Sequence, residues 1–233
     1  MAHDSSSMGS TRVCCDKYCW RLFTLSRVSA SHVSTSHIPP TFNRISFGSD
    51  IIILAREIGA PALVPSAMYD ISRSTPSAAA LGVPASSDRS TTTRLDHEDL
   101  LRVLRGREHA SRYFSTFIVN ELEGREPSPW CMRRKETKPV ESRACQIAFE
   151  AITFELLRDV NGIVSSRTSD PIYAMADAEV MQTKEGRPEE DNTSPMRTCE
   201  TCRTEFGAAV DAAKEEFWKK LPSWFGVEVP SWG

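Results

Sequence analysis

The sequence contains no apolar run approaching the roughly 20 residues that a membrane-spanning helix needs. Neither sign of charge is in large excess, because the net charge is −3 and the pI is about 6.0. The protein therefore has no overall positive field that would attract nucleic acid or anionic lipid. The sequence also lacks the common catalytic and nucleotide-binding motifs: the P-loop, the HExxH zinc motif, the nucleophile elbow and the dinucleotide glycine fingerprint. We therefore expect a protein without enzymatic activity.

The N-terminus lacks the continuous apolar stretch of a secretory signal peptide. Arg12 is followed by Val13 and two cysteines, and Asp16 and Lys17 then interrupt any apolar region. The basic, serine-rich composition leaves a mitochondrial transit peptide open beside the simpler interpretation of an uninformative tail. Seven cysteines are an odd number and do not suit a fully paired disulfide framework. We expect an intracellular protein, in the cytoplasm or the nucleus.

Composition and periodicity divide the chain into five parts. The serine-rich arm at 1–49 has too little apolar patterning to offset chain entropy and is predicted to be disordered. A helical segment at 50–73 precedes a linker rich in serine, threonine, proline and alanine at 74–93. A helical region follows at 94–228, and a short tail occupies 229–233. The predicted fold is mostly α, an irregular multi-helix region behind a disordered arm.

Apolar residues three and four apart carry the helix predictions. Thr93, three residues before Asp96, has the pattern of an N-cap. Gly106 can interrupt or end the helix that follows, and Pro222 is expected to stop the last helix. A polar loop is expected at 184–194. The predicted helices lie near residues 51–58, 65–71, 100–104, 110–122, 145–157, 171–178 and 202–221.

Four cysteines lie in the helical half of the chain. Cys199 and Cys202 have the C-x2-C spacing that lets two thiolates bind one tetrahedral ion from a tight turn. Cys131 and Cys145, each beside a predicted helix start, can complete a four-cysteine structural zinc site. Ordinary buried thiols are an equally open interpretation, because free cysteines are common in protein cores. Thioredoxin-like redox chemistry is disfavoured, since the strand-to-helix setting is missing.

A basic cluster follows Trp130, formed by Arg133, Arg134, Lys135 and Lys138. Such residues can contact phosphates while tryptophan stacks on a base, but the chain from residue 94 onward carries a net charge of −5. A solvated loop is therefore the preferred interpretation, and nucleic acid is not an expected partner. The run His97-Glu98-Asp99 is similarly expected to be solvated, its two carboxylates suiting a helix N-terminus.

Three stretches together resemble a known family. They are LAREIGAPALVPSAMYDISR at 54–73, LRVLRGRE at 101–108 with FSTF at 114–117, and CETC at 199–202 with AKEEFWKKLPSWF at 213–225. In this order and spacing they are similar to the helical region that follows the BTB (POZ) fold in a group of basidiomycete fungal proteins. The serine-rich arm shows no BTB-like alternation of strands and helices. The resemblance therefore implies the helical C-terminal region of a BTB protein, from a truncated or wrongly predicted gene product.

The resemblance implies a protein-interaction role. We expect a non-enzymatic protein–protein interaction module with protein partners of unknown identity and no membrane attachment. Self-association stays open, because the BTB fold that dimerises in such families is missing here. The alternative is a zinc-stabilised regulatory or transcription-associated domain, based on the four cysteines and the basic loop.

Overall fold

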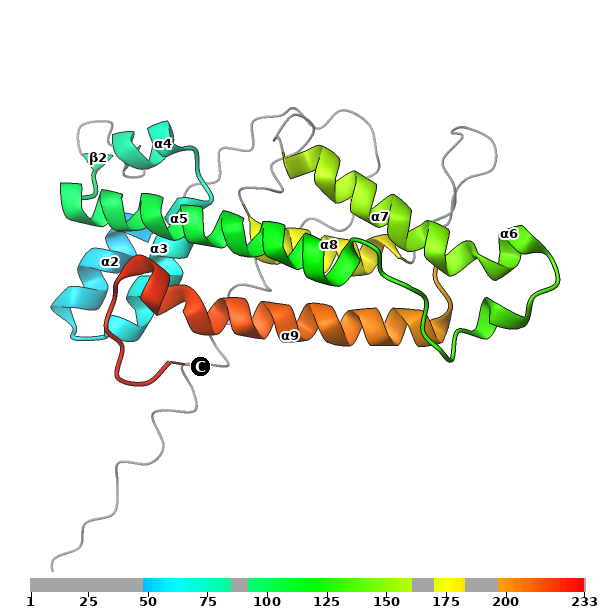
Figure 1. Ribbon diagram of the computed structural model, residues 1–233. Helices are drawn as coiled ribbons and strands as arrows, with labels where there is room; N and C mark the ends of the chain where they lie inside the picture. Colours follow the sequence, from blue (N-terminus) through cyan, green and yellow to red (C-terminus); the bar gives the residue numbers. More distant parts are fainter. Residues whose placement is uncertain (1–47, 85–91, 161–169, 183–196, 233) are drawn as a thin grey trace, which may run out of the picture. The chain divides into compact units, whose positions relative to one another are not determined.

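The structure is a computed structural model that describes residues 48–84, 92–160, 170–182 and 197–232. The predicted mostly α fold is confirmed (Figure 1). Nearly all of the predicted disordered arm and the predicted polar loop at 184–194 lie outside the described residues. The helices are α2 (Gly48–Glu57), α3 (Val64–Ser72), α4 (Pro76–Leu81), α5 (His97–Phe117), α6 (Pro139–Ser142), α7 (Ala144–Val160), α8 (Pro171–Met181) and α9 (Glu200–Phe225).

Short elements complete the described chain. The 3-10 helices η1 (Pro61–Leu63) and η3 (Met132–Lys135) stand before α3 and α6, and a π-helical turn, η2 (Ile118–Leu122), continues α5. The predicted linker at 74–93 contains α4 and both strands of a two-residue antiparallel ladder, β1 (Val83–Pro84) with β2 (Thr92–Thr93). Among the described helices, none is long and apolar enough to cross a membrane.

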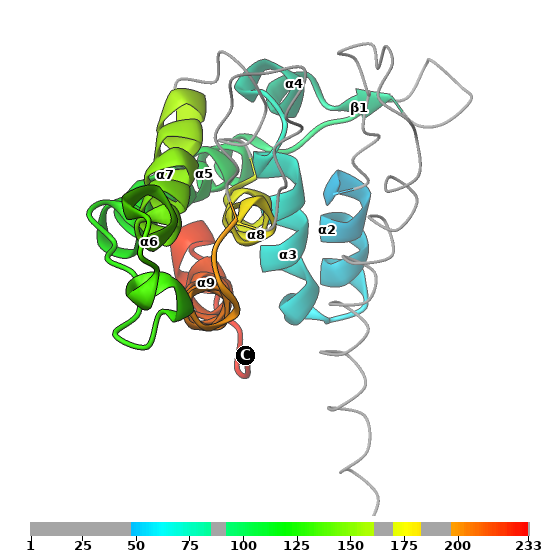
Figure 2. The same cartoon turned by 90° about the vertical axis from the view of Figure 1, so that its right-hand side faces the viewer.

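The two longest helices, α5 and α9, pack side by side in opposite directions (Figure 1). Viewed along these helices, α8 and α3 lie between α2 on one side and α5, α7 and α9 on the other (Figure 2). The predicted stripe on α9 is confirmed, because its members are all buried. They are Cys202, Phe206, Val210, Ala213, Phe217 and Leu221. The core therefore follows α9 from the cysteines at its start to Phe225 at its end.

The predicted interruption at Gly106 is wrong, because α5 runs through this residue. The side chain of Phe225 is fully buried and its ring lies directly against the Gly106 backbone. A Cβ atom at Gly106 would lie 2.0 Å from Cε1 of Phe225. Gly106 therefore leaves space for an aromatic ring from the far end of the chain, and α5 remains helical through this glycine.

We expect Gly106→Ala to destabilise the protein although alanine is the better helix former. The gain in helix propensity is about 1 kcal/mol, whereas overpacking a core typically costs about 1–3 kcal/mol. Gly207→Ala in α9 is the matched control, because its Cβ would meet only the mobile carboxylate of Glu179, at 3.2 Å. Urea unfolding of both variants measures the difference; equal stabilisation by both would show that the Phe225 ring moves without cost.

Pro222 does not stop α9, which continues to Phe225, so this prediction is wrong as well. Proline has no N–H for the carbonyl of the residue four positions earlier, here Trp218. That carbonyl instead accepts a hydrogen bond of 2.7 Å from the indole Nε1 of Trp232, and the two indole rings stack with centroids 5.1 Å apart. The helix ends at Gly226, whose φ of 62° is left-handed. A residue of the predicted tail therefore replaces the missing donor.

The start of α5 also differs from the prediction. Asp96, not Thr93, is the N-cap: its Oδ1 accepts the backbone N–H of Asp99 at 2.7 Å. The Asp99 side chain is buried rather than solvated, and its Oδ1 accepts a hydrogen bond from Arg56 of α2 at 2.7 Å. This ion pair joins the end of α2 to the start of α5, a long-range contact that local sequence does not encode.

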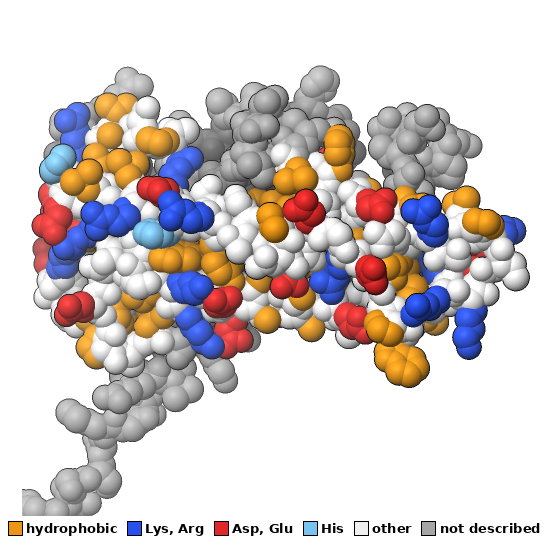
Figure 3. Space-filling model, in the orientation of Figure 1, with side chains coloured by type: hydrophobic (Ala, Val, Ile, Leu, Met, Phe, Trp, Pro, Cys, Tyr) orange, Lys and Arg blue, Asp and Glu red, His pale blue; other side chains and the backbone are white. Residues whose placement is uncertain are grey.

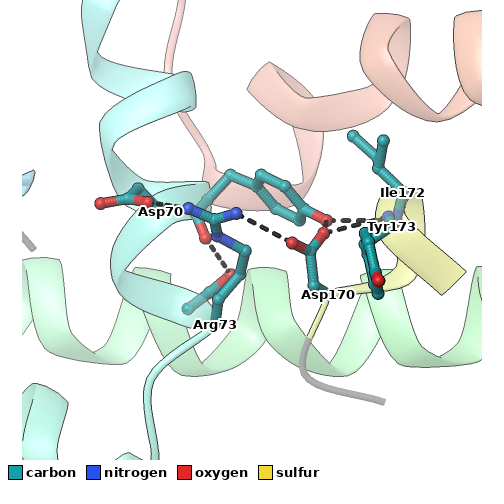
Figure 4. A network of polar contacts seen from close by, with 7 residues as sticks. Asp70, Arg73, Asp170, Ile172 and Tyr173 are labelled. Carbon is teal, nitrogen blue, oxygen red and sulfur yellow. Dashed lines mark hydrogen bonds and ion pairs between the residues drawn. The ribbon is translucent and has the colours of Figure 1, made fainter. Parts of the chain in front are cut away.

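A buried polar network joins α3 to the start of α8 (Figure 4). Asp170 is the N-cap of α8 and accepts hydrogen bonds from the backbone N–H of Tyr173 at 3.2 Å and from the Tyr69 hydroxyl at 2.9 Å. Arg73 donates to the other carboxylate oxygen at 2.8 Å and also pairs with Asp70. Burial, together with the charge of Asp170, raises the pKa of Tyr69 well above its usual value, so the hydroxyl stays protonated and donates.

Candidate metal centre

Three separate segments bring the four cysteines together. Cys131 precedes η3, Cys145 lies in the first turn of α7, and the C-x2-C pair occupies the N-cap and first turn of α9. All four side chains are buried, and their Sγ atoms lie within 4.8 Å of one another. Every cysteine of the predicted set is therefore in the cluster. Cys14, Cys15 and Cys19 lie outside the described residues.

The sulfur spacing fits a tetrahedral metal ion. The Sγ atom of Cys131 lies 3.7 Å from that of Cys145 and 3.8 Å from that of Cys199. Four sulfurs around a zinc ion at about 2.3 Å stand about 3.8 Å apart along the edges of the tetrahedron. A disulfide requires about 2.05 Å, and the four described cysteines are free thiols. These thiols can bind one metal ion.

The helix starts supply backbone donors to the sulfur atoms. The N–H of Cys199 donates to Sγ of Cys145 with an N–S distance of 3.2 Å. Burial opposes ionisation of Cys199, but the backbone N–H groups of Cys202 and Met132, and then the thiols of Cys202 and Cys131, lower its pKa to about 7. These donors stabilise negative charge on sulfur, as a metal-binding thiolate requires.

The other two perturbed thiols shift in the opposite direction. Burial raises the pKa of Cys145 to about 11, and burial raises the pKa of Cys202 well above its usual value. Neighbouring thiolates repel one another in a buried site. A cation at the centre removes this penalty, since a coordinated thiol is deprotonated.

Two buried polar side chains hold the cysteine segments in place. Ser128 donates its hydroxyl to Glu205 of α9 at 2.6 Å, and its carbonyl accepts the N–H of Cys131 at 2.9 Å. On the other side, the backbone carbonyl of Gln182 at the end of α8 accepts the N–H of Thr198 at 3.0 Å, and the side-chain Oε1 of Gln182 accepts the Thr198 hydroxyl at 3.1 Å. Neither residue was expected from the sequence, because a lone serine or glutamine in a loop has no distinguishing pattern. Such supporting contacts orient metal ligands.

The cluster also continues the apolar core. Phe149 follows Cys145 by one helical turn, Phe206 follows Cys202 by one turn, and their rings meet edge to face with centroids 5.6 Å apart. The guanidinium of Arg125 lies over both rings, at 5.4 and 5.0 Å. The cysteines therefore occupy positions where ordinary buried thiols also fit, and the sulfur spacing is what favours a metal.

The remaining candidate residues lie away from the cluster's centre. His97 is exposed in the first turn of α5, and the basic residues Arg134, Lys135 and Lys138 are also exposed. Comparison of the chain with protein-family models, with curated proteins and with solved structures gives no match. The geometry of the four thiols is therefore the basis on which we infer the chemistry of this site.

Proposed function

We propose that the chain is a non-enzymatic, helical protein-interaction module whose four-cysteine cluster holds a structural zinc ion. The observation that carries the proposal is the cluster of four buried sulfurs with two edges of 3.7 and 3.8 Å, the spacing of a zinc tetrahedron. Tetrahedral sites with four sulfurs suit zinc or iron, and metal analysis distinguishes the two.

A zinc ion here would join three segments that lie far apart in the sequence. It would join the loop before η3 to the starts of α7 and α9, at the end of the core opposite Phe225. Because the ligands come from distant parts of the sequence, closing them around one ion stabilises the fold. Four thiolates leave no open coordination position, which is typical of structural rather than catalytic zinc.

The interaction role is supported by the arrangement of the family-like stretches and by the surface. The three stretches lie on α3, α5 and α9, which pack against one another. They thus belong to one helical unit, as the proposal of a scaffold region after a BTB fold expects. Exposed large apolar side chains are found on several elements, including Leu54 of α2, Val119 of η2 and Trp130 before η3. Apolar surface of this kind suits contact with other proteins.

Elemental analysis of the full chain, purified under reducing conditions, should find one zinc ion per chain. Chelation should then speed amide hydrogen exchange around Cys131 and in the first turns of α7 and α9, because the ion no longer holds them. Exchange in α3, far from the cluster, is the internal control and should change least. A chain without metal, or with iron in place of zinc, would overturn the zinc part of the proposal.

A further inference from the structure

The loop that carries Cys131 presents large apolar side chains to solvent. We call residues 128–138 the tryptophan loop. Trp130 is 81% exposed and Met132 is 65% exposed, on either side of the buried Cys131. Tryptophan usually buries most of its surface in a folded protein. Tryptophan, methionine and arginine are the residues that protein interfaces select.

The backbone of the tryptophan loop is fixed even though these side chains are exposed. The N–H of Trp130 donates to the Ser128 hydroxyl at 3.1 Å, and Ser128 is itself bound to α9 through Glu205. Arg134 donates its guanidinium to the Pro129 carbonyl at 3.3 Å, which folds η3 back toward Trp130. A fixed backbone lowers the ordering cost of binding.

Basic residues follow the exposed tryptophan in the same loop. Arg133, Arg134 and Lys135 begin three residues after Trp130, and none of them forms an ion pair with a described acidic side chain, whereas Lys138 is paired with Glu141 at 2.9 Å. Figure 3 shows hydrophobic and basic side chains gathered at the end of the helical unit where this loop lies. These cations, together with the nearby apolar anchor, complement a partner that carries carboxylates and an apolar residue.

We infer that the tryptophan loop binds an acidic peptide segment of a partner protein, with Trp130 as its apolar anchor and Arg133, Arg134 and Lys135 facing its carboxylates. This inference rests on the proposed interaction function and specifies its partner. A nucleic acid fits less well, because the cationic stretch is short while the chain from residue 94 onward carries a net charge of −5, which repels an extended polyanion.

Selection of a random peptide-display library on the zinc-loaded full chain tests this inference. We expect enriched peptides that combine Asp or Glu with a large apolar residue. Trp130→Ala should weaken their binding by about 30-fold or more, as at an interface hot spot. Arg133→Glu with Lys135→Glu should weaken it as well, and added salt should reduce binding to the unmodified chain. Phe154→Ala, which removes another exposed aromatic side chain (63% exposed), is the matched control and should leave binding unchanged.

The outcomes separate this inference from the proposed function. Zinc content and unfolding midpoint are measured for each variant and should match the unmodified chain, because the changed side chains are exposed or unpaired. Peptides whose binding survives Trp130→Ala would overturn the tryptophan loop as the site while leaving an interaction module. A library without enriched peptides would overturn both, and binding of a single-stranded oligonucleotide in preference to acidic peptides would assign the loop to nucleic acid.

Discussion

Cys202→Ser should lower the free energy of unfolding by several kcal/mol when zinc is present and by much less after chelation. The serine hydroxyl is similar in size to the thiol but does not provide a thiolate ligand. At a free zinc concentration 1,000 times the dissociation constant, bound zinc adds about 4 kcal/mol to stability, and loss of a ligand removes most of this. Urea unfolding of both chains, with zinc and with chelator, measures the effect.

The dependence on zinc distinguishes a ligand from a core residue. Cys202 is almost fully buried and belongs to the apolar stripe of α9. If it had a packing role alone, Cys202→Ser would lower the free energy of unfolding equally with zinc and with chelator. Equal costs would therefore contradict the metal centre. Cys19→Ser is the matched control, because Cys19 lies outside the described residues and outside the proposed ligand set. It should change neither zinc content nor stability.

Sequence spacing predicted the candidate metal centre better than it predicted the helix ends. The C-x2-C pattern marks Cys199 and Cys202 locally, and Cys131 and Cys145 completed the set as the other cysteines of the helical half. No local pattern, however, shows that a loop and two helix starts meet within 4.8 Å. Contacts from Ser128 and Gln182 establish that meeting, and they depend on tertiary structure.

The errors at Gly106 and Pro222 share one physical cause. Both residues are poor helix formers, and in each case an aromatic residue distant in the chain compensates. Phe225 occupies the space that a side chain at Gly106 would fill, and Trp232 donates to the carbonyl that Pro222 leaves without its usual partner. Propensity describes an isolated helix, so it does not include these contacts. The apolar stripe of α9 was predicted correctly because the burial of this helix depends on its own periodicity.

Asp170→Ala should lower the free energy of unfolding by about 3–5 kcal/mol, the usual cost of removing one partner of a buried ion pair. The Arg73 side chain is only 10% exposed and would keep Asp70 as its remaining charged partner in this network. The substitution also removes the N-cap of α8, worth about 1 kcal/mol, and leaves the buried Tyr69 hydroxyl without its acceptor. Urea unfolding of the full chain measures the total.

Two further variants separate these contributions. Asp170→Asn keeps a side-chain oxygen for the N-cap and for Tyr69 but removes the negative charge. It should therefore lower the free energy of unfolding less than Asp170→Ala, and the difference reports the cap together with the Tyr69 hydrogen bond. Glu215→Ala breaks an exposed pair with Lys219 on α9 and should cost less than about 1 kcal/mol. If Asp170→Ala lowers the free energy of unfolding no more than Glu215→Ala does, the polar network does not hold α3 to α8. The family-like segment at 54–73 would then be joined to the rest of the unit by its other contacts, such as the ion pair of Arg56 with Asp99 and the edge-to-face pair of Tyr69 and Phe217.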